Sequence, residues 1–359
     1  MHADFMRLAL DSAARGRGRV SPNPMVGAVV VRAGRVVGRG FYRRYGGPHA
    51  EVEALRAAGR AARGATVYVT LEPCCFRGKT GACTEALLRA GVARVFAATL
   101  DPHPRVNGRG VRCLRRAGIE CRVGLLGAAA RQLNEAYFTY HRLHRPFVVL
   151  KLAATLDGML AAPGGESRWI TGPVARRRAQ ELRGAADAVL VGVNTVLRDD
   201  PRLTCRVLPR KRLLRVVLDS RLRTGTGARL LRSRDPVLVL TSAAGAKRAG
   251  SLARPGVDVR VVRRGSDGLL RWPDVLRELC RREVQSLLVE GGATVASSAL
   301  DAGIVDRVCV FQAPKILGPG LGFSQRMSGR SLGAAIRLEG VRHEVLGRDV
   351  LTEGRVSRD

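Results

Sequence analysis

The stretch Pro48-His49-Ala50-Glu51 decides, together with Glu72-Pro73-Cys74-Cys75 and Cys83, how the first part of this chain is organised. One imidazole and two thiolates hold Zn²⁺ tetrahedrally and leave its fourth position open for water, whose pKa falls to about 7. A carboxylate beside that water takes its proton and later delivers it to a departing amine. We therefore predict that His49, Cys74 and Cys83 are zinc ligands and that Glu51 is the proton shuttle.

The spacing of these residues restricts where they lie in helices and strands. Residues two apart on a helix do not face each other, so His49 and Glu51 cannot both lie inside a helix and share a site. Pro48 places His49 at the entrance of a helix expected over about 50–59. The order His-x-Glu, Pro-Cys and a further Cys is typical of zinc deaminases that act on nucleobases.

Two other interpretations of these residues are open. A structural zinc site is closed by four protein ligands, and Cys75 is the obvious fourth candidate. Adjacent cysteines are awkward joint ligands, however, and a closed site leaves Glu51 without a role. Alternatively, the cysteines are inert core residues and His49 is a hydrogen-bonded polar group. Residue types and spacing together favour the catalytic site.

Composition indicates a two-domain protein. The length of 359 residues allows two domains of ordinary size, and a hydrophobic content of 46% allows both to form cores. No apolar run approaches a membrane span, and the first residues lack a signal-peptide pattern. The eight cysteines fit metal ligands and core thiols better than a disulfide framework. We therefore expect a cytoplasmic location and no membrane partner.

The net charge of +32 suggests a nucleic-acid-binding protein, because basic surfaces release counterions from phosphates. Five of the 62 basic residues are lysines, and the arginines are spread along the whole chain. Aromatic residues amount to 4%, and they form no stripe on which bases could stack. We interpret the charge as replacement of Lys by Arg over a solvated surface, and expect no specific nucleic-acid partner.

Alternating helix and strand patterns predict an α/β fold in both halves. In the first half we expect a helix over 3–15, a hairpin of strands 25–32 and 35–40, and strands at 66–71, 94–99 and 119–123. The Arg/His-rich stretch 140–146 separates the halves. In the second half we expect strands at 147–152, 188–193, 214–219, 236–241, 258–262, 286–290 and 305–312.

The segment 287–294 combines an apolar strand with a Gly291-Gly292 turn that opens a helix. Bare backbone N–H groups and a helix N-terminus then point at one spot, which suits a pyrophosphate. Gly-Gly also forms ordinary tight turns. The segments 199–201 and 156–158 are likewise interpreted first as turns.

Taken together, these stretches resemble the bifunctional riboflavin-biosynthesis deaminases/reductases over nearly the whole chain. The matching stretches of the first half are 21–27, 48–51, 72–83 and 101–110, and those of the second half are 151–158, 165–172, 191–204, 289–292 and 313–318. The eight-residue gap between Cys74 and Cys83 is characteristic of this family. Cytidine and tRNA deaminases have a shorter Cys-x-x-Cys gap.

The resemblance implies a cytidine-deaminase-like α/β/α domain over residues 1–145 and a dihydrofolate-reductase-like α/β domain over residues 146–359. The first domain would use Zn²⁺ to hydrolyse the 2-amino group of 2,5-diamino-6-(5-phosphoribosylamino)pyrimidin-4-one. The second would use NADPH to reduce the ribosyl group to ribityl, giving 5-amino-6-(5-phosphoribitylamino)uracil. We expect a small phosphorylated pyrimidine as substrate and a homo-oligomeric assembly.

The same resemblance implies roles for individual residues. In the deaminase, the substrate positions are Asn23, Lys79, Thr80 and Asp101. In the reductase, the substrate positions are Ser167, Arg183, Leu203, Arg206 and Glu290, and the cofactor positions are Ala153, Trp169, Thr195, Asp199, Ser220, Gly291 and Gly292. Lys151 and Asp199 would assist opening of the ribose ring and hydride delivery, with Lys151 as a proton donor near the ring oxygen.

The sequence departs from the family pattern mainly around the deaminase site. The family often has His at the positions of Tyr42 and Phe76, Pro-Pro at Gly81-Ala82, and Asn at His103. In the reductase, Asn194 replaces a small residue. These departures leave the expected zinc ligands and Glu51 unchanged, so they bear on substrate fit and rate more than on reaction type.

Overall fold

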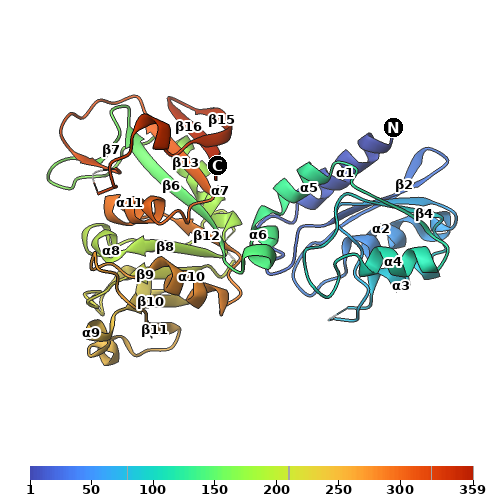
Figure 1. Cartoon of the computed structure of the whole chain (residues 1–359), viewed down its shortest axis with the longest axis horizontal. Helices are drawn as coiled ribbons and strands as arrows, with labels where there is room; N and C mark the ends of the chain where they lie inside the picture. Colours follow the sequence, from blue (N-terminus) through green and yellow to red (C-terminus); the bar gives the residue numbers. More distant parts are fainter. Residues whose placement is uncertain (79, 209–210, 325, 359) are drawn as a thin grey trace. The chain divides into compact units, whose positions relative to one another are not determined.

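The computed structural model describes residues 1–78, 80–208, 211–324 and 326–358. These residues form two compact units, Met1–His144 and Arg145–Asp359, and each has a main sheet of its own (Figure 1). Every helix in the described part of the chain is too short or too polar to span a bilayer.

The elements of the first unit follow one another as α1 (His2–Ala14), β1 (Gly27–Arg32), β2 (Arg35–Phe41), α2 (Ala50–Ala58), η1 (Gly59–Ala62), β3 (Thr66–Val69), α3 (Cys83–Arg89), β4 (Arg94–Ala97), α4 (Arg109–Arg116), β5 (Glu120–Val123), α5 (Gly127–Leu133) and α6 (Glu135–Leu143).

The sheet of the first unit has the strand order β2-β1-β3-β4-β5. β1 pairs antiparallel with β2 and β3, whereas β3, β4 and β5 run parallel. Because side chains alternate along a strand, Ala28 and Val30 of β1 pack with α2, α3 and α4, while Val29 and Val31 pack with α1 and α5. The unit therefore has three layers, and the predicted α/β/α fold of this half is confirmed.

Two glycines of β2 let α2 lie close against the sheet. A Cβ atom on Gly38 would lie 2.2 Å from the carbonyl oxygen of Ala54, and one on Gly40 would lie 2.3 Å from that of Ala50. Any side chain at either position would push α2 outward. The close contact therefore fixes the first turn of α2, where the motif residues His49 and Glu51 lie.

The predicted hairpin is present, with β1 and β2 joined through Ala33 and Gly34, which both have positive φ. The expected strand 66–71 ends earlier, at Val69. The stretch 140–146, expected only as a separator, is helical as far as Leu143, because α6 packs Tyr137 and Phe138 against Leu71.

The elements of the second unit are β6 (Phe147–Thr155), β7 (Met159–Ala161), α7 (Pro173–Ala185), β8 (Ala188–Gly192), α8 (Val193–Asp199), β9 (Leu214–Leu218), η2 (Arg229–Arg232), β10 (Val237–Thr241), α9 (Ala243–Ala246), η3 (Ala249–Leu252), β11 (Val257–Val261), α10 (Trp272–Cys280), β12 (Ser286–Val289), α11 (Ala293–Asp301), β13 (Arg307–Ala313), β14 (Leu321–Gly322), η4 (Leu332–Ala334), β15 (Leu338–Leu346) and β16 (Asp349–Val356).

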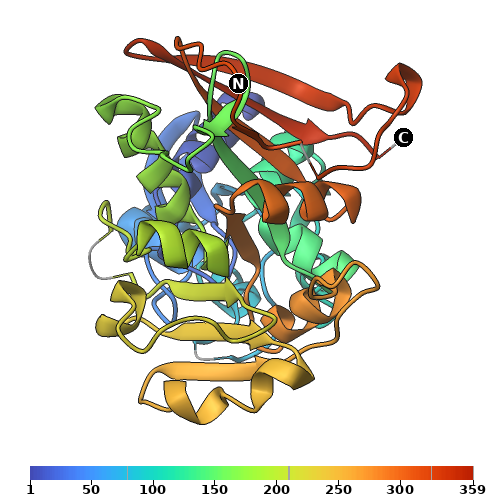
Figure 2. The same ribbon diagram turned by 90° about the vertical axis from the view of Figure 1, so that its left-hand side faces the viewer.

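The main sheet of this unit has the order β11-β10-β9-β8-β12-β6-β13-β16-β15. The strands from β11 to β13 run parallel, and β16 and β15 extend the sheet antiparallel. Figure 2 shows these last two strands in red at one edge. Helices α10 and α11 pack on one face of the sheet, and α7 and α8 pack on the other.

The predicted strands of the second half are all present, and their ends lie within three residues of the expected ones. The hairpin of β15 and β16 was not predicted. Most residues of β15 are exposed, so this edge strand lacks the alternation of buried apolar residues that identifies strands in a sequence.

Candidate active sites

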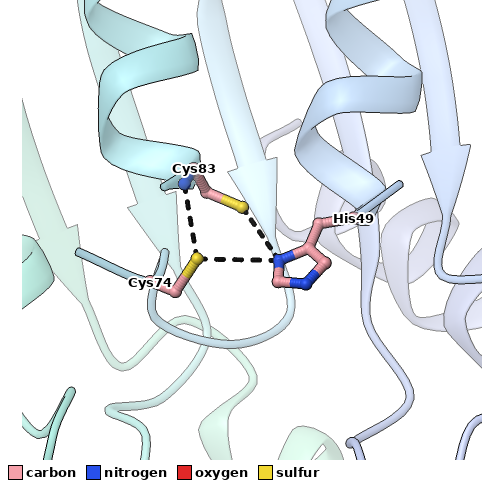
Figure 3. Close-up of side chains that lie close together, drawn as sticks. All are labelled: His49, Cys74 and Cys83. Carbon is pink, nitrogen blue, oxygen red and sulfur yellow. Dashed lines mark hydrogen bonds between the residues drawn. The ribbon is translucent and has the colours of Figure 1, made fainter. Parts of the chain in front are cut away.

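The three expected zinc ligands meet at one point in the first unit. Ligand atoms of His49, Cys74 and Cys83 all lie within 4.8 Å of one another, and Figure 3 shows both sulfurs facing the same imidazole nitrogen. The Nδ1 atom of His49 is 3.2 Å from the Sγ of Cys83 and 3.6 Å from the Sγ of Cys74. One nitrogen and two sulfurs at this spacing fit three corners of a tetrahedral metal site.

Each of these residues lies at the end of a helix or strand. His49 is the extended residue directly before α2, as predicted from Pro48. Cys83 is the first residue of α3, and its backbone N–H donates to the Sγ of Cys74 at 3.3 Å. Cys74 lies in the loop that follows β3. The cluster thus forms where one strand ends and two helices begin.

Glu51 lies in the first turn of α2 with only 3% of its surface exposed. Burial, with a smaller contribution from the nearby Cys74, raises the pKa of its carboxyl to about 7, and His49 opposes the shift. A carboxyl group with a pKa near neutrality can both accept and return a proton at physiological pH.

The two thiols of the cluster are electrostatically unequal. A hydrogen bond with Cys83 lowers the pKa of the Cys74 thiol below its usual value, against the effect of burial. The same hydrogen bond, together with burial, raises the pKa of Cys83 well above its usual value. Cys74 is therefore the first of the two to become a thiolate, which is the form that binds metal.

Cys75 points elsewhere. Its Sγ donates to the carbonyl oxygen of Arg105 at 3.8 Å. Within the described part of the chain, the metal-ligand group contains His49, Cys74 and Cys83 and no fourth ligand. This arrangement leaves a tetrahedral position for water and argues against a closed structural site.

Asn23 is connected to the cluster through Tyr42, one of the departures from the family pattern. The Asn23 side-chain amide donates to the Tyr42 hydroxyl at 3.0 Å, and this hydroxyl also accepts from the backbone N–H of Gly46 at 2.8 Å. The Tyr42 ring lies edge-on to the His49 ring at 5.3 Å between centroids. Tyr42 therefore fixes the positions of an expected substrate residue and an expected metal ligand together.

Asp101 is held by a tyrosine that no sequence motif singled out. The Tyr137 hydroxyl of α6 donates to Oδ1 of Asp101 at 3.0 Å, and the backbone N–H of His103 donates to the same oxygen at 2.8 Å. Burial raises the pKa of Asp101 to about 6, although these hydrogen bonds favour the charged form.

Glu72 organises the loops around Cys74. Its carboxylate accepts three backbone hydrogen bonds, from Asp101 at 3.2 Å, Gly108 at 2.8 Å and Val111 at 3.0 Å. These groups lie at and before the start of α4, so Glu72 satisfies N–H groups that have no partner within the helix. The motif Glu72-Pro73-Cys74 therefore contains a positioning residue that we did not single out from the sequence.

The other expected deaminase residues lie on the loop between Cys74 and Cys83. The Thr80 carbonyl accepts from the Gly78 N–H at 3.1 Å. Lys79 lies outside the described residues. Two further departures, Phe76 and His103, stack on each other at 6.3 Å, and the Arg105 guanidinium lies 4.1 Å from the Phe76 ring centroid.

The second unit contains a cavity of about 970 Å³. All of the expected reductase residues line it, namely Lys151, Ala153, Ser167, Trp169, Arg183, Thr195, Asp199, Leu203, Arg206, Ser220, Glu290, Gly291 and Gly292. They come from β6, α7 and α8, from the segments that follow β7 and α8, and from the loops that follow β9 and β12. Ligands of open α/β sheets bind at the carboxyl ends of the strands, and this cavity has that location.

A buried ion pair lies in the cavity wall. Arg183 of α7 donates to both carboxylate oxygens of Glu290, at 3.0 Å and 2.8 Å, and to the Thr204 carbonyl at 2.9 Å. Burial alone would raise the pKa of Glu290, but the charges of Arg183 and Lys151 outweigh it and hold that pKa below its usual value. Glu290 is therefore a fixed negative charge at the end of β12.

Lys151 lies near the same ion pair, and its pKa is shifted by the same neighbouring charges. Burial lowers the pKa of its ammonium group, Glu290 opposes this shift, and Arg183 adds to it. A lysine whose pKa is below its usual value gives up a proton more readily. Its Nζ atom lies 5.7 Å from the centroid of the Phe311 ring, which forms part of the apolar floor beneath it.

Trp169 is held at the cavity by two cations outside the set expected from the sequence. The Arg176 guanidinium lies 4.4 Å from the Trp169 ring centroid, and the Lys315 ammonium donates to the Trp169 carbonyl at 2.9 Å. Ser167 donates to Oδ1 of Asp199 at 3.4 Å. Lys315 lies within the stretch 313–318, which resembles the family pattern. No sequence motif distinguishes Arg176 from the many other arginines.

Comparison with known proteins matches both units to families. Residues 146–352 match the RibD C-terminal domain, and residues 1–99 match the cytidine and deoxycytidylate deaminase zinc-binding region. The riboflavin biosynthesis protein RibD of Aquifex aeolicus is 44% identical over 350 residues, which cover 97% of this chain and 96% of that protein. RibD of Escherichia coli is 41% identical over 88% of each chain.

Solved structures agree with this assignment. A diaminohydroxyphosphoribosylaminopyrimidine deaminase/5-amino-6-(5-phosphoribosylamino)uracil reductase from Thermotoga maritima is 38% identical, with a TM-score of 0.89 over 99% of both chains. Acinetobacter baumannii RibD is 32% identical, with a TM-score of 0.88 over 99% of both chains. The chain therefore belongs to the RibD family of riboflavin biosynthesis, and it contains both the deaminase domain and the reductase domain of that family.

Proposed function

We propose that His49, Cys74 and Cys83 hold a zinc ion and that Glu51 moves the proton in a hydrolytic deamination. The donor set supports this proposal, because one imidazole and two thiolates at the observed spacing leave one coordination position open. A bound zinc ion supplies the positive charge that acidifies a water molecule at that position.

In this proposal Glu51 acts twice. Its buried carboxylate accepts a proton from the attacking water and then donates it to the departing amine. The raised pKa supports this double role, since a strongly acidic carboxyl would not return the proton. Asn23 and Asp101 bind the pyrimidine or its phosphoribosyl group in this assignment, with Tyr42 and Tyr137 holding them in position.

We propose that the cavity of the second unit binds NADPH and the deaminated product together. NADPH supplies the hydride that converts the ribosyl group to ribityl. The loop Gly291-Gly292 before α11 offers backbone N–H groups for the pyrophosphate, and Thr195 lies beside it: a Cβ on Gly292 would be 3.8 Å from the Thr195 hydroxyl. Ala153, Trp169, Ser220 and Asp199 complete the cofactor positions.

The proposed substrate positions lie around the Arg183–Glu290 ion pair. Ser167, Leu203 and Arg206 line the same cavity. Lys151 donates a proton to the ring oxygen as the ribose opens, and its lowered pKa supports this role. Asp199, fixed by Ser167, assists the hydride transfer.

The proposed reactions are the hydrolysis of 2,5-diamino-6-(5-phosphoribosylamino)pyrimidin-4-one within residues 1–145 and the NADPH-dependent reduction of its product within residues 146–359. All eight cysteines are free, which fits the proposed reducing, cytoplasmic location. The homo-oligomeric assembly stays a prediction.

Two observations carry this function: the buried Glu51 lies two residues from the expected ligand His49, and the second unit has a cavity lined by every expected reductase residue. The test supplies the diaminopyrimidinone phosphate with and without NADPH, and follows ammonia and NADPH oxidation separately. We expect ammonia in both reactions and NADPH oxidation that follows deamination. Zinc-loaded protein that releases no ammonia would contradict the deaminase assignment, and deaminated substrate that consumes no NADPH would contradict the reductase assignment.

A further inference from the structure

The cavity of the second unit is strongly cationic. Its described lining residues include ten arginines or lysines and two acidic residues, Asp199 and Glu290. Glu290 is already paired with Arg183. Elsewhere in the lining, Arg223 belongs to the turn after β9 and Arg229 to η2. Eight arginines of the described lining, Arg223 and Arg229 among them, lie beyond the Arg183–Glu290 pair, which indicates that the cavity takes a ligand with an additional anionic group.

In the turn after β9, Arg223 lines the cavity, whereas the acidic residue Asp219 does not. Asp219 is fully buried, and its Oδ2 accepts from the Thr224 backbone N–H at 2.7 Å and from the Thr224 hydroxyl at 2.8 Å. Ser220 and Arg223 of the same turn line the cavity. An acidic side chain facing the cofactor would favour a free ribose hydroxyl, whereas an arginine favours a phosphate ester.

The turn is rigidly held, so the position of Arg223 is defined. The Ser242 hydroxyl donates to the Ser220 carbonyl at 2.6 Å, and Asp219 closes the turn from the other side through Thr224. The backbone of residues 219–224 is thereby fixed at both ends. An arginine on a fixed turn loses less conformational freedom when it binds an anion than one on a mobile loop.

Asn194 orients the Arg223 side chain. Its Oδ1 accepts a hydrogen bond from the Arg223 guanidinium at 2.8 Å. Asn194 precedes Thr195 in α8, and Thr195 lies beside Gly292 at the proposed pyrophosphate site. A small residue, which the family resemblance leads us to expect at position 194, could not make this bond. The departure at Asn194 therefore places a guanidinium near the phosphate-binding end of the cavity.

We propose that Arg223, oriented by Asn194, contacts the 2′-phosphate of the nicotinamide cofactor and makes the reductase select NADPH over NADH. This inference rests on the proposed reductase function. Arg223 acts as a specificity-determining residue, and Asn194 is a positioning residue. A phosphate dianion accepts charge-assisted hydrogen bonds from a guanidinium, which are stronger than those between neutral groups.

The test measures binding of NADPH and NADH to the full-length protein by isothermal titration calorimetry. We expect Arg223→Ala to weaken NADPH binding by about tenfold or more, the effect of one lost charge-assisted hydrogen bond, and to leave NADH binding within about twofold. Adenosine 2′,5′-bisphosphate should lose affinity in the same way, whereas AMP should not. Asn194→Ala should weaken NADPH binding by a few-fold, since the guanidinium remains but is less well oriented.

Arg221→Ala is the matched control, because Arg221 is an exposed arginine of the same turn that does not line the cavity. It should leave both affinities unchanged. Equal losses of NADPH and NADH affinity in Arg223→Ala would overturn the inference, as would equal effects of Arg223→Ala and Arg221→Ala. A wild-type chain that binds neither dinucleotide would instead contradict the reductase assignment itself.

Discussion

The two candidate sites differ in how their residues are brought together. The metal-ligand group of the first unit uses three side chains between positions 49 and 83, each at a helix start or after a strand. The cavity of the second unit is lined by residues from Lys151 to Arg326, which lie on many strands, helices and loops. The first site depends on a few side chains of fixed chemistry, and the second depends on where the ends of parallel strands meet.

Burial, however, has the same kind of effect in both sites. It raises the pKa of Glu51 and lowers that of Lys151, because removal from water disfavours the charged form of either group. An acid and a base are thus both shifted towards neutral pH. The comparison suggests that substitutions in the first unit should abolish activity by removing a ligand or a proton shuttle, whereas substitutions in the second should produce graded losses.

The largest expected effect is that of Cys83→Ser. It removes a thiolate ligand, so the variant should lose bound zinc and all measurable deamination. Reduction of supplied deaminated substrate should persist, because every described lining residue of the cavity belongs to the second unit. Metal analysis and the two separate assays test this.

Cys75→Ser is the matched control for that experiment, since Cys75 is the adjacent thiol outside the ligand group. It should keep its zinc and its deaminase activity. If a Cys83→Ser protein that remains folded by circular dichroism lost both activities, the two sites would not be independent.

Glu51→Gln should have the next largest effect. Its amide cannot shuttle a proton, so deamination should fall by about 10²–10⁴-fold, the contribution of general acid–base catalysis. The zinc content should remain one per chain, because Glu51 is not a ligand. Glu53 lies in the same helical turn but is paired with Arg56, so Glu53→Gln should change the deaminase activity and the zinc content very little. Zinc loss in Glu51→Gln would instead make Glu51 a ligand.

Lys151→Arg should reduce the kcat of the reductase by about tenfold, a barrier change of roughly 1.4 kcal/mol. An arginine keeps its charge but does not release its proton at any ordinary pH. The wild-type rate should also fall as pH rises through the Lys151 pKa, which burial places below the usual value of 10.5, because only the ammonium form is a donor. This alkaline decline should be absent in Lys151→Arg.

Two further variants separate charge from proton donation at Lys151. Lys151→Ala removes both and should be at least as slow as Lys151→Arg. Lys211→Arg changes a lysine outside the cavity, whose Nζ donates to the Gly184 carbonyl at 2.8 Å, and should keep a normal kcat. A near-normal kcat in Lys151→Arg would show that charge alone matters there.

The smallest expected effect is that of Tyr137→Phe on deamination. Losing one hydrogen bond to the Asp101 carboxylate should raise KM by a few-fold, with less change in kcat. The bond lowers the pKa of Asp101, so its removal should raise that pKa above about 6 and move the acid-side decline of kcat/KM to higher pH.

Tyr68→Phe controls for the loss of a buried tyrosine hydroxyl, since Tyr68 is paired with His2 at 2.6 Å. Its pH profile should match that of the wild type. An unchanged profile in Tyr137→Phe would show that Tyr137 supports the fold and does not position Asp101.

The sequence predicted elements whose residues carry a periodic apolar pattern. The helix starting after His49, the hairpin at Ala33-Gly34 and the parallel strands of the second half belong to this group. It did not predict the hairpin of β15 and β16, and for β15 the reason is that an edge strand with exposed side chains has no such pattern. The helix α6 was missed because its Arg- and His-rich end concealed the buried Tyr137 and Phe138.

By itself, the sequence determined the chemistry that the two halves contain: an imidazole, two thiolates and a carboxylate in one, and a Gly-Gly turn with Lys151 and Glu290 in the other. These are properties of residue types at short spacing, so they can be recognised without a fold. Only the tertiary structure placed Tyr137 against Asp101, Arg183 against Glu290 and Arg223 against Asn194. Each of these contacts joins residues that are 29 or more positions apart. The packing of strands and helices alone decides which of the five tyrosines, or of the many arginines, makes it.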